Sequence, residues 1–250
     1  MRNRPETQIE NSIENRVNTR IDILTDTQTE IRLTLIRHGA TLSNKEGRYL
    51  GKTDESLSLD GIRTLEKALM EGICPTADLL FSGPMKRCIE TAHILYPGQA
   101  PVLIPEWTEM DFGTFEGHNY KELSGSPDYQ RWIDSGGTLP FPEGESREAF
   151  ILRSVAGYEN MLRYMKSVWE RSAVSGQSNR SVSAVVHGGT IMALLSHFLE
   201  GEYFDYQVKC GQGYSGRLVF PADGGAPEWK EFRPLPEFTV SELTKGETNG

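Results

Sequence analysis

From residue 31 onward the chain alternates short apolar runs with segments in which apolar residues recur at helical spacing, and this alternation constrains the fold most. Strands are expected at residues 31–36, 78–81, 101–105 and 182–186, with terminal strands at 214–220 and 229–232. Helices are expected at residues 58–72, 84–95, 146–172 and 190–199. Strands that alternate with helices favour a mostly parallel sheet covered on both faces, so the sequence predicts an α/β three-layer sandwich, α/β/α.

The length of 250 residues is that of one large domain or one domain with appendages. Residues 1–29 are mostly polar and charged and bury little apolar surface, so they are predicted to be a disordered or loosely helical tail. Residues 30–250 make up the predicted domain. Residues 119–145, rich in Gly, Pro, Ser and Asp, predict an irregular insertion with one short helix. We expect pocket residues that contact a ligand in this insertion and around residues 211–214.

The composition excludes several classes of protein. A hydrophobic share of 37% with 24% charged residues is typical of a soluble globular domain. No apolar run approaches the ~20 residues that span a bilayer, so no membrane partner is expected. The net charge of −9 argues against nucleic acid. The scattered cysteines Cys74, Cys88 and Cys210 favour reduced thiols in the cytoplasm and lack zinc-site spacing. The oligomeric state is left open.

Two of the predicted strands end in a histidine. Residues 33–36 lead directly into Arg37-His38-Gly39, and residues 182–186 lead into His187-Gly188-Gly189. Ligands of open α/β sheets bind outside the carboxyl ends of the strands, so His38 and His187 are expected to meet at one edge. An arginine beside a histidine suits a doubly charged oxyanion, because the planar guanidinium keeps its charge and offers several donors.

Three further segments supply partners for a phosphate-ester chemistry: residues 41–54 with Thr41, Asn44 and Gly51, residues 82–92 with Arg87, and residues 109–117. His38 is the candidate nucleophile, with its pKa depressed by Arg37 and Arg87. A carboxyl group in residues 106–116 is the candidate general acid, but spacing alone does not choose among Glu106, Glu109, Asp111 and Glu116. Arg87 could instead pair with Glu90 one turn later. His93, His118, His197 and Cys88 are interpreted as packing or surface residues.

These motifs, in this order, resemble the histidine phosphatase superfamily, also called phosphoglycerate mutase-like, over roughly residues 31–200. The resemblance implies a phosphohistidine on His38 and selects Glu109 as the acid that protonates the leaving oxygen. It implies that Arg37, Arg87 and His187 hold the phosphoryl oxygens, helped by Asn44 and the backbone of Gly188, with Thr41 and Gly51 also at the substrate. It implies no metal and no cofactor.

The phosphatase branch, with α-ribazole phosphatases and broad-specificity phosphatases, is the more similar one. Thr41 stands where phosphoglycerate mutases carry Glu, and Leu50 where they tend to carry Thr. We therefore expect a phosphatase for a small phosphorylated metabolite: α-ribazole phosphate, a sugar phosphate or a phosphoglycerate. The alternatives are a cofactor-dependent phosphoglycerate mutase and a non-catalytic phospho-ligand-binding protein. The complete set Arg37, His38, Arg87, Glu109 and His187 speaks against the last.

Overall fold

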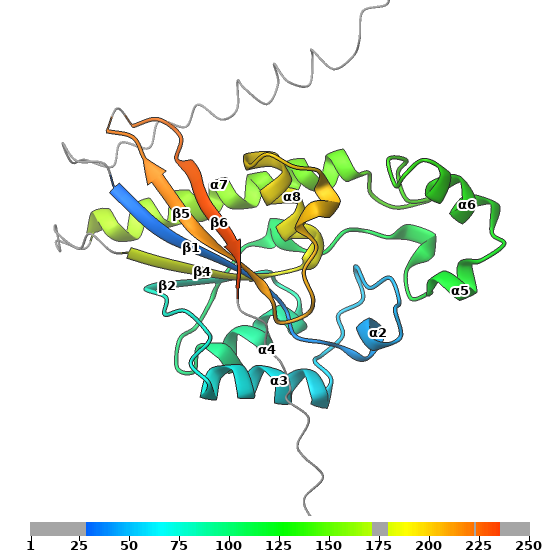
Figure 1. The fold of residues 1–250 in the computed structure, drawn as a ribbon, viewed down its shortest axis with the longest axis horizontal. Coiled ribbons are helices and arrows are strands. Elements are labelled where there is room, and N and C mark those ends of the chain that lie inside the picture. Colours follow the sequence, from blue (N-terminus) through cyan, green and yellow to red (C-terminus); the bar gives the residue numbers. More distant parts are fainter. Residues whose placement is uncertain (1–28, 172–179, 223, 236–250) are drawn as a thin grey trace, which may run out of the picture.

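A computed structural model of the chain describes residues 29–171, 180–222 and 224–235. Its centre is a six-stranded sheet in the order β3-β2-β4-β1-β5-β6 (Figure 1). The strands are β1 (Thr29–Arg37), β2 (Leu79–Ser82), β3 (Val102–Leu103), β4 (Arg180–Val186), β5 (Gly213–Phe220) and β6 (Glu228–Pro234). The four strands β1 to β4 pair in parallel, and β5 runs antiparallel to both of its neighbours. The predicted α/β class and mostly parallel sheet are confirmed.

Helices cover both faces of the sheet (Figure 1). On one side lie α3 (Leu59–Met70) and α4 (Lys86–Leu95), and on the other lie α7 (Arg147–Arg171) and α8 (Gly188–Phe198). Successive strand residues point to opposite faces, and β1 follows this rule. Leu33 and Leu35 join the apolar core that includes residues of α7 and α8, whereas Ile36 joins the core of α3 and α4. Apolar side chains on both sides of the sheet therefore hold the strand ends in place.

Two predicted helix boundaries can be compared with the local chemistry. Ser58 caps α3 as expected, because its hydroxyl accepts a hydrogen bond from the Gly61 amide at 3.1 Å. The helix expected from Pro84 begins two residues later, at Lys86. Gly83 still donates to the carbonyl of Val185 at 2.9 Å, so the chain continues in the direction of β2 before it turns.

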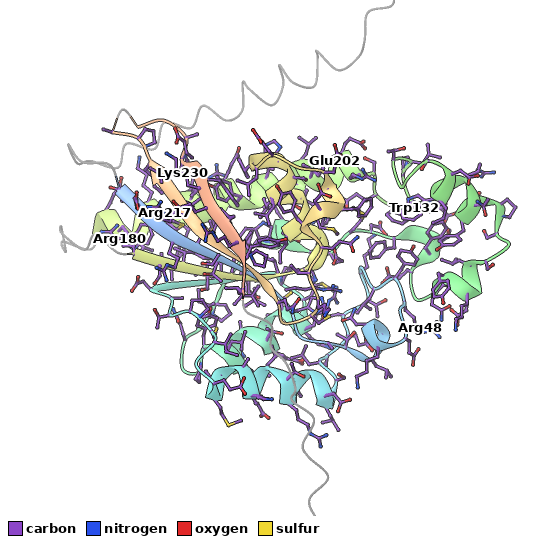
Figure 2. All side chains as sticks on the ribbon, viewed as in Figure 1. Arg48, Trp132, Arg180, Glu202, Arg217 and Lys230 are labelled. Atoms are coloured by element: carbon purple, nitrogen blue, oxygen red, sulfur yellow. The ribbon has the colours of Figure 1, made fainter. Side chains whose placement is uncertain are left out.

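The insertion contains two short helices, α5 (Tyr120–Leu123) and α6 (Pro127–Asp134), so the prediction of one was wrong. Asn119 and Ser126 each cap a separate helix, and Gly125 between them has a φ of 86°, which a continuous helix does not allow. Trp132 lies on this side of the molecule, far from Arg217 and Lys230 on the sheet (Figure 2). The insertion thus projects beyond the strand ends.

Several short elements were not predicted: α2 (Leu42–Lys45) and the 3₁₀ turns η1 (Pro105–Trp107), η2 (Gly113–Phe115) and η3 (Tyr203–Tyr206). β3 is shorter than the expected strand because the chain enters η1 at Pro105. The predicted tail lies outside the described residues except for Thr29, the first residue of β1. Among the described helices none combines the length and the apolar character needed to cross a membrane.

Candidate active site

The sheet brings His38 and His187 together, because β1 and β4 are parallel neighbours whose ends are in register. Arg37 pairs with Val186, and the His38 amide donates to the carbonyl of Val186 at 2.9 Å. The two imidazole rings lie 5.2 Å apart between centroids, nearly edge to face. Both side chains are buried. The predicted meeting of the two strand-end histidines is therefore what the structure shows.

A local hydrogen bond fixes the orientation of the His38 ring. Its Nδ1 lies 2.8 Å from the carbonyl oxygen of Gly39, which can only accept, so Nδ1 carries the proton. Nε2 then keeps its lone pair. Burial, followed by the charges of Arg37 and Arg87, lowers the pKa of His38 well below its usual range, while the Gly39 bond opposes this. The result is a neutral imidazole with one free nucleophilic nitrogen.

Arg37 and Arg87 supply positive charge beside this ring. Arg37 donates to the carbonyl of Val208 at 2.7 Å, and Arg87 donates to the carbonyls of Thr53 and Gly51 at 2.8 and 3.0 Å. Within the described part of the chain, the buried Nε–H of each arginine has no hydrogen-bond partner. A buried cation with unpaired donors is costly unless an anion completes it. The pair is therefore suited to a tetrahedral oxyanion.

In the described structure Arg87 and Glu90 have different partners, so the alternative ion pair between them is not formed. The Glu90 carboxylate accepts from the Leu57 amide at 2.7 Å, while the guanidinium of Arg87 turns to backbone carbonyls of the loop at residues 50–53. That loop is in turn fixed by Glu116, which accepts from the amides of Gly51 and Thr53 at 2.9 and 3.0 Å. Glu116 therefore supports Arg87 through the loop.

Glu109 is the carboxylate of its segment that approaches His187. Its Oε2 lies 3.9 Å from Nδ1 of His187, and its side chain is only 10% exposed. Burial raises its pKa, against smaller lowering by the Met110 amide, by Arg87 and Arg37, and by the backbone of Gly189. A carboxyl group with a raised pKa retains a proton that it can give to a leaving oxygen.

The competing carboxylates have other partners. Glu106 accepts from the side-chain amide of Asn160 at 2.7 Å, and Asp111 forms an ion pair with Lys52 at 2.5 Å. Glu116 holds the loop that supports Arg87. The geometry therefore separates four carboxylates that spacing alone could not rank.

The N-terminus of α8 lies against the carboxylate of Glu109 and the guanidinium of Arg37. At Gly189 a Cβ would lie 2.5 Å from Oε1 of Glu109, so a side chain there would displace the carboxylate. At Gly188 a Cβ would lie 3.2 Å from Nε of Arg37. In the described residues, the N-cap residue His187 makes no side-chain capping hydrogen bond, and the Gly189 amide faces Glu109, so the Gly188 amide is the one of this pair that can donate to an anion. The pair Gly188-Gly189 lets the helix end approach the site closely.

The remaining predicted residues have mainly structural contacts. The Thr41 hydroxyl is buried and accepts from the Asn44 amide at 3.2 Å, and Asn44 Oδ1 accepts from the Thr41 amide, which makes a capping box for α2. Gly51 uses its amide and carbonyl to join Glu116 to Arg87. Burial lowers the pKa of His187, and Cys88 Sγ lies 3.5 Å from its Nε2.

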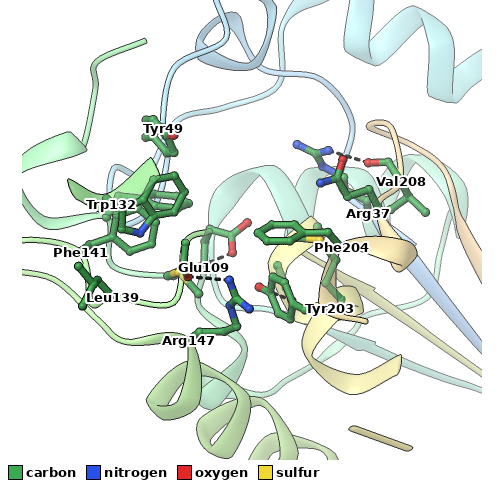
Figure 3. A pocket seen from close by; sticks show the side chains of 17 residues that line it. Arg37, Tyr49, Glu109, Trp132, Leu139, Phe141, Arg147, Tyr203, Phe204 and Val208 are labelled. Atoms are coloured by element: carbon green, nitrogen blue, oxygen red, sulfur yellow. Dashed lines mark hydrogen bonds between the residues drawn. The ribbon is translucent and has the colours of Figure 1, made fainter. Parts of the chain in front are cut away.

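A cavity of about 260 Å³ opens beside Arg37 and Glu109 (Figure 3). Its walls are largely aromatic and come from the loop after α2, the segment between η1 and η2, the insertion and η3. The aromatic residues of these walls are Tyr49, Phe112, Trp132, Phe141, Tyr203 and Phe204. The insertion contributes to this cavity as expected. The opposite wall, however, comes from residues 203–208, whereas residues 211–214, expected there, do not line it, because Gly211 donates backward to the carbonyls of Arg37 and His38.

Sequence reasoning missed two arginines of α7. Arg147 lines the cavity, and Arg153 contacts the backbone that carries Glu109. In the sequence both look like ordinary charged residues of an amphipathic helix, and no local signal distinguishes them. In the described ranges, no group of three or more His, Cys, Asp or Glu side chains is placed to hold a metal ion.

Two histidines and Arg37 at the carboxyl ends of parallel strands, together with Arg87 of α4 and a carboxyl group whose pKa is raised, define a phosphoryl-transfer type of site. Comparison agrees with this class: residues 33–213 match the histidine phosphatase superfamily (branch 1). The chain belongs to this superfamily, which confirms the resemblance inferred from its motifs.

Individual relatives carry several names. The chain is 33% identical to the adenosylcobalamin/alpha-ribazole phosphatase of Escherichia coli (strain K12), over 49% of this chain and 63% of that protein. It is 28% identical to a probable 2-carboxy-D-arabinitol-1-phosphatase of Arabidopsis thaliana, over 80% of this chain but only 40% of that protein. A crystal structure of a phosphoserine phosphatase mutant from Entamoeba histolytica, in complex with phosphoserine, has a TM-score of 0.62 at 25% identity, covering 81% of this chain and 96% of that one. A phosphoglycerate mutase also matches.

Proposed function

We propose that the protein hydrolyses a small-molecule phosphomonoester through a phosphohistidine on His38. The observation that carries the proposal is the His38 ring itself. It is neutral, held in one tautomer by Gly39, and placed beside the two arginines whose buried Nε–H groups are unpaired in the described chain. A non-catalytic phosphate-binding protein has no need of an imidazole held neutral with a free Nε2.

In the first step Nε2 of His38 attacks phosphorus while the bond from phosphorus to the leaving oxygen breaks. Arg37, Arg87 and His187 hold the non-bridging oxygens, with the backbone amide of Gly188 as a further donor. Glu109 gives its proton to the leaving oxygen, so that an alcohol departs. The raised pKa of Glu109 supports this role, because an ordinary carboxyl group is ionised at neutral pH.

In the second step water attacks the phosphohistidine, and the bond from phosphorus to Nε2 breaks. Glu109, now a carboxylate, accepts a proton from that water, which restores the acid and the neutral His38. Inorganic phosphate leaves. The cycle needs no external co-reactant besides water.

Hydrolysis, rather than mutase activity, is supported by the basic residues that the insertion offers. A mutase must grip a second acidic group of its substrate. In residues 118–144 the basic residues are Lys121 and Arg131. Both lie on the exposed short helices, and Arg131 is paired with Asp128. We expect phosphate release from monoesters and negligible interconversion of 2- and 3-phosphoglycerate with 2,3-bisphosphoglycerate as primer. Primed interconversion faster than phosphate release would make the protein a mutase.

We further propose that the activity is independent of metal ions and located in the cytoplasm. Arg37 and Arg87 supply the positive charge that a metal ion provides in other phosphatases. Cys74, Cys88 and Cys210 are free thiols, which supports a reducing compartment. Activity should persist in EDTA, and loss of activity restored by a divalent ion would contradict the metal-free proposal.

The test of the function is a trapped intermediate. Acid-labile, base-stable ³²P should appear on the wild type after brief incubation with a labelled monoester. It should be absent from His38→Ala, which should also lose turnover. His93→Ala is the matched control, because His93 is an exposed histidine of α4. Normal turnover by His38→Ala would refute the nucleophile assignment.

A further inference from the structure

We propose that the leaving group of the substrate is a bulky, uncharged, flat apolar alcohol, and this inference rests on the function proposed above. The cavity beside Glu109 is where a leaving group must lie if Glu109 protonates it. Figure 3 shows Tyr49, Trp132 and Phe141 on one side of Glu109 and Tyr203 and Phe204 on the other. The leaving group would therefore sit between two aromatic walls.

The first wall is already packed. Tyr49 and Phe112 have ring centroids 5.1 Å apart, Phe112 and Phe141 also 5.1 Å, and Trp132 and Phe141 4.9 Å. Such edge-to-face and stacked contacts hold the rings in defined orientations. A preformed aromatic wall offers a flat face at little ordering cost, which favours an aromatic or alicyclic group over a flexible polar one.

Arg147 joins the two walls. Its Nη2 donates to the carbonyls of Gly136 and Gly137 at 3.0 and 2.6 Å. Its guanidinium carbon also lies 5.2 and 5.0 Å from the ring centroids of Tyr203 and Phe204, at cation–π distance. The charge of Arg147 is therefore engaged by carbonyls and rings on both sides of the cavity.

The charged residues that line the cavity are Arg37, Glu109 and Arg147. Arg37 and Glu109 belong to the reacting end, and Arg147 is engaged by the walls. An ammonium group on the leaving group would thus lose water beside the guanidinium of Arg147 without gaining a counter-ion of its own, which is unfavourable. At the rim, Leu139 and Phe204 are 47% and 45% exposed, and an apolar leaving group would cover them.

The test compares three monoesters of primary alcohols: 2-phenylethyl phosphate, ethyl phosphate and O-phosphoserine. Ester size and charge vary while the leaving oxygen stays a primary alkoxide. The kcat/KM for 2-phenylethyl phosphate should exceed the other two by about tenfold or more. Equal or greater kcat/KM for O-phosphoserine would overturn the inference. Failure to hydrolyse any of these esters or p-nitrophenyl phosphate would instead overturn the proposed function.

Variants locate the preference. Trp132→Ala and Phe204→Ala, one from each wall, should each reduce the ratio of kcat/KM for 2-phenylethyl over ethyl phosphate by about fivefold or more. Because both kcat/KM values are measured on the same preparation of a variant, their ratio does not depend on the fraction of the protein that is folded. Tyr120→Ala is the control, because Tyr120 is an exposed aromatic residue of the insertion and does not line the cavity. An unchanged ratio in both wall variants would place the leaving group elsewhere.

A second, independent observation concerns Glu109, and the geometry points to Arg153 as its positioning residue. Glu109 lies between η1 and η2, in a segment without helix or strand. Arg153 on α7 donates through Nη1 to the carbonyls of Glu106 and Thr108 at 2.6 and 3.0 Å, and to the Thr108 hydroxyl at 2.8 Å. Its Nη2 lies 3.4 Å from the carbonyl oxygen of Glu109.

Glu145 fixes the other edge of the Arg153 guanidinium. Its two carboxylate oxygens accept from Nε and Nη2 at 3.1 and 2.8 Å, a two-bond arrangement that sets the plane of the guanidinium. Arg153 thereby ties the segment that carries the acid to the long helix α7. Its removal should let Glu109 move away from the leaving oxygen.

The test measures how the loss of kcat in Arg153 variants depends on the leaving group of the ester. Arg153→Met should lower kcat for ethyl phosphate about tenfold more than for p-nitrophenyl phosphate, whose leaving group needs no proton. Arg153→Lys should recover little, because lysine has no planar fork. In a Glu109→Gln background the same substitution should add almost no further loss. Equal losses on both esters, or full additivity with Glu109→Gln, would mean a structural role only. Arg163→Met, an exposed arginine of the same helix, is the control.

Discussion

The two ends of the site are built from different parts of the chain. The phosphoryl end consists of charged or titratable side chains at the ends of β1 and β4 and on α4, namely the partly buried Arg37 and the buried His38, Arg87 and His187. The leaving-group end is aromatic and comes from loops, short helices and η3. In the proposed mechanism, the reacting groups are fixed to the strand ends and α4, whereas selectivity is carried by segments that can vary without disturbing the strands.

Glu109 lies at the boundary between these ends. It lines the aromatic cavity and also approaches His187. Substitutions at the phosphoryl end should therefore slow all esters equally, and those at the leaving-group end should change the ranking of esters. Substitutions that affect Glu109 should slow esters of weakly acidic alcohols more than esters whose leaving group departs without a proton. The predictions below test this division.

The largest effect is expected from Arg87→Met. We expect kcat/KM to fall about 10³-fold, in the same proportion for ethyl, 2-phenylethyl and p-nitrophenyl phosphates, because the lost charge acts on the phosphoryl group. Steady-state kinetics on the three esters measure the ratio of wild-type to variant kcat/KM for each. Arg63→Met, on the exposed face of α3, is the control. A loss that varies strongly among the esters would contradict the division of the site.

Glu109→Gln should come next. The rate for ethyl phosphate should fall about 10²-fold or more, and that for p-nitrophenyl phosphate less than about tenfold, since nitrophenolate leaves without a proton. Glu106→Gln is the matched control three residues earlier, with its oxygen already engaged by Asn160.

The pH dependence should follow the same residue. Because the pKa of Glu109 is raised, the acid stays protonated above the usual carboxyl range, and kcat/KM for ethyl phosphate falls as pH rises through that raised value. The alkaline decline should be absent in Glu109→Gln. If kcat/KM of the Glu109→Gln variant declined equally at alkaline pH, the decline would belong to a titrating group other than Glu109.

These two ends also differ in how far the sequence predicts them. His38 and His187 could be placed because each follows an apolar strand, and parallel neighbours present their ends at the same edge. The choice of Glu109 among the neighbouring carboxylates needed the family resemblance. The two aromatic walls could not be predicted, because Tyr49, Trp132 and Phe204 line one cavity only through the tertiary packing of segments far apart in the sequence. Spacing along the chain carries no record of such contacts.

Adjacent glycines of α8 offer a smaller and sharper test. Gly188→Ala places a methyl group against the Arg37 guanidinium and should slow all esters alike, by about fivefold. Gly189→Ala places it 2.5 Å from Glu109 Oε1 and should slow ethyl phosphate about tenfold more than p-nitrophenyl phosphate. Thermal unfolding of both variants checks their folding. The same ester profile for both would show that the two ends are not separable at this helix.

The smallest effect is on stability, and it too should distinguish the two ends. The folded-state pKa values of His38 and His187 lie well below the usual 6.5. Below about pH 6.5 the two histidines therefore bind protons in the unfolded chain but stay neutral in the folded chain. Stability is therefore full above about pH 6.5 and is lost as pH falls toward the folded-state values, by at most about 1.4 kcal/mol per pH unit for each histidine. Urea unfolding at pH 7, 6 and 5 measures this slope.

His38→Gln and His187→Gln should each make the decline of unfolding free energy with falling pH shallower, whatever they do to stability at pH 7. Trp132→Ala should lower stability by a similar amount at every pH, because no titrating group is removed. His93→Gln, from an exposed position, should leave the slope unchanged. If the slope is the same in all four variants, the two buried histidines are not held neutral by the fold. The phosphoryl end would then lack the free imidazole on which the proposed chemistry depends.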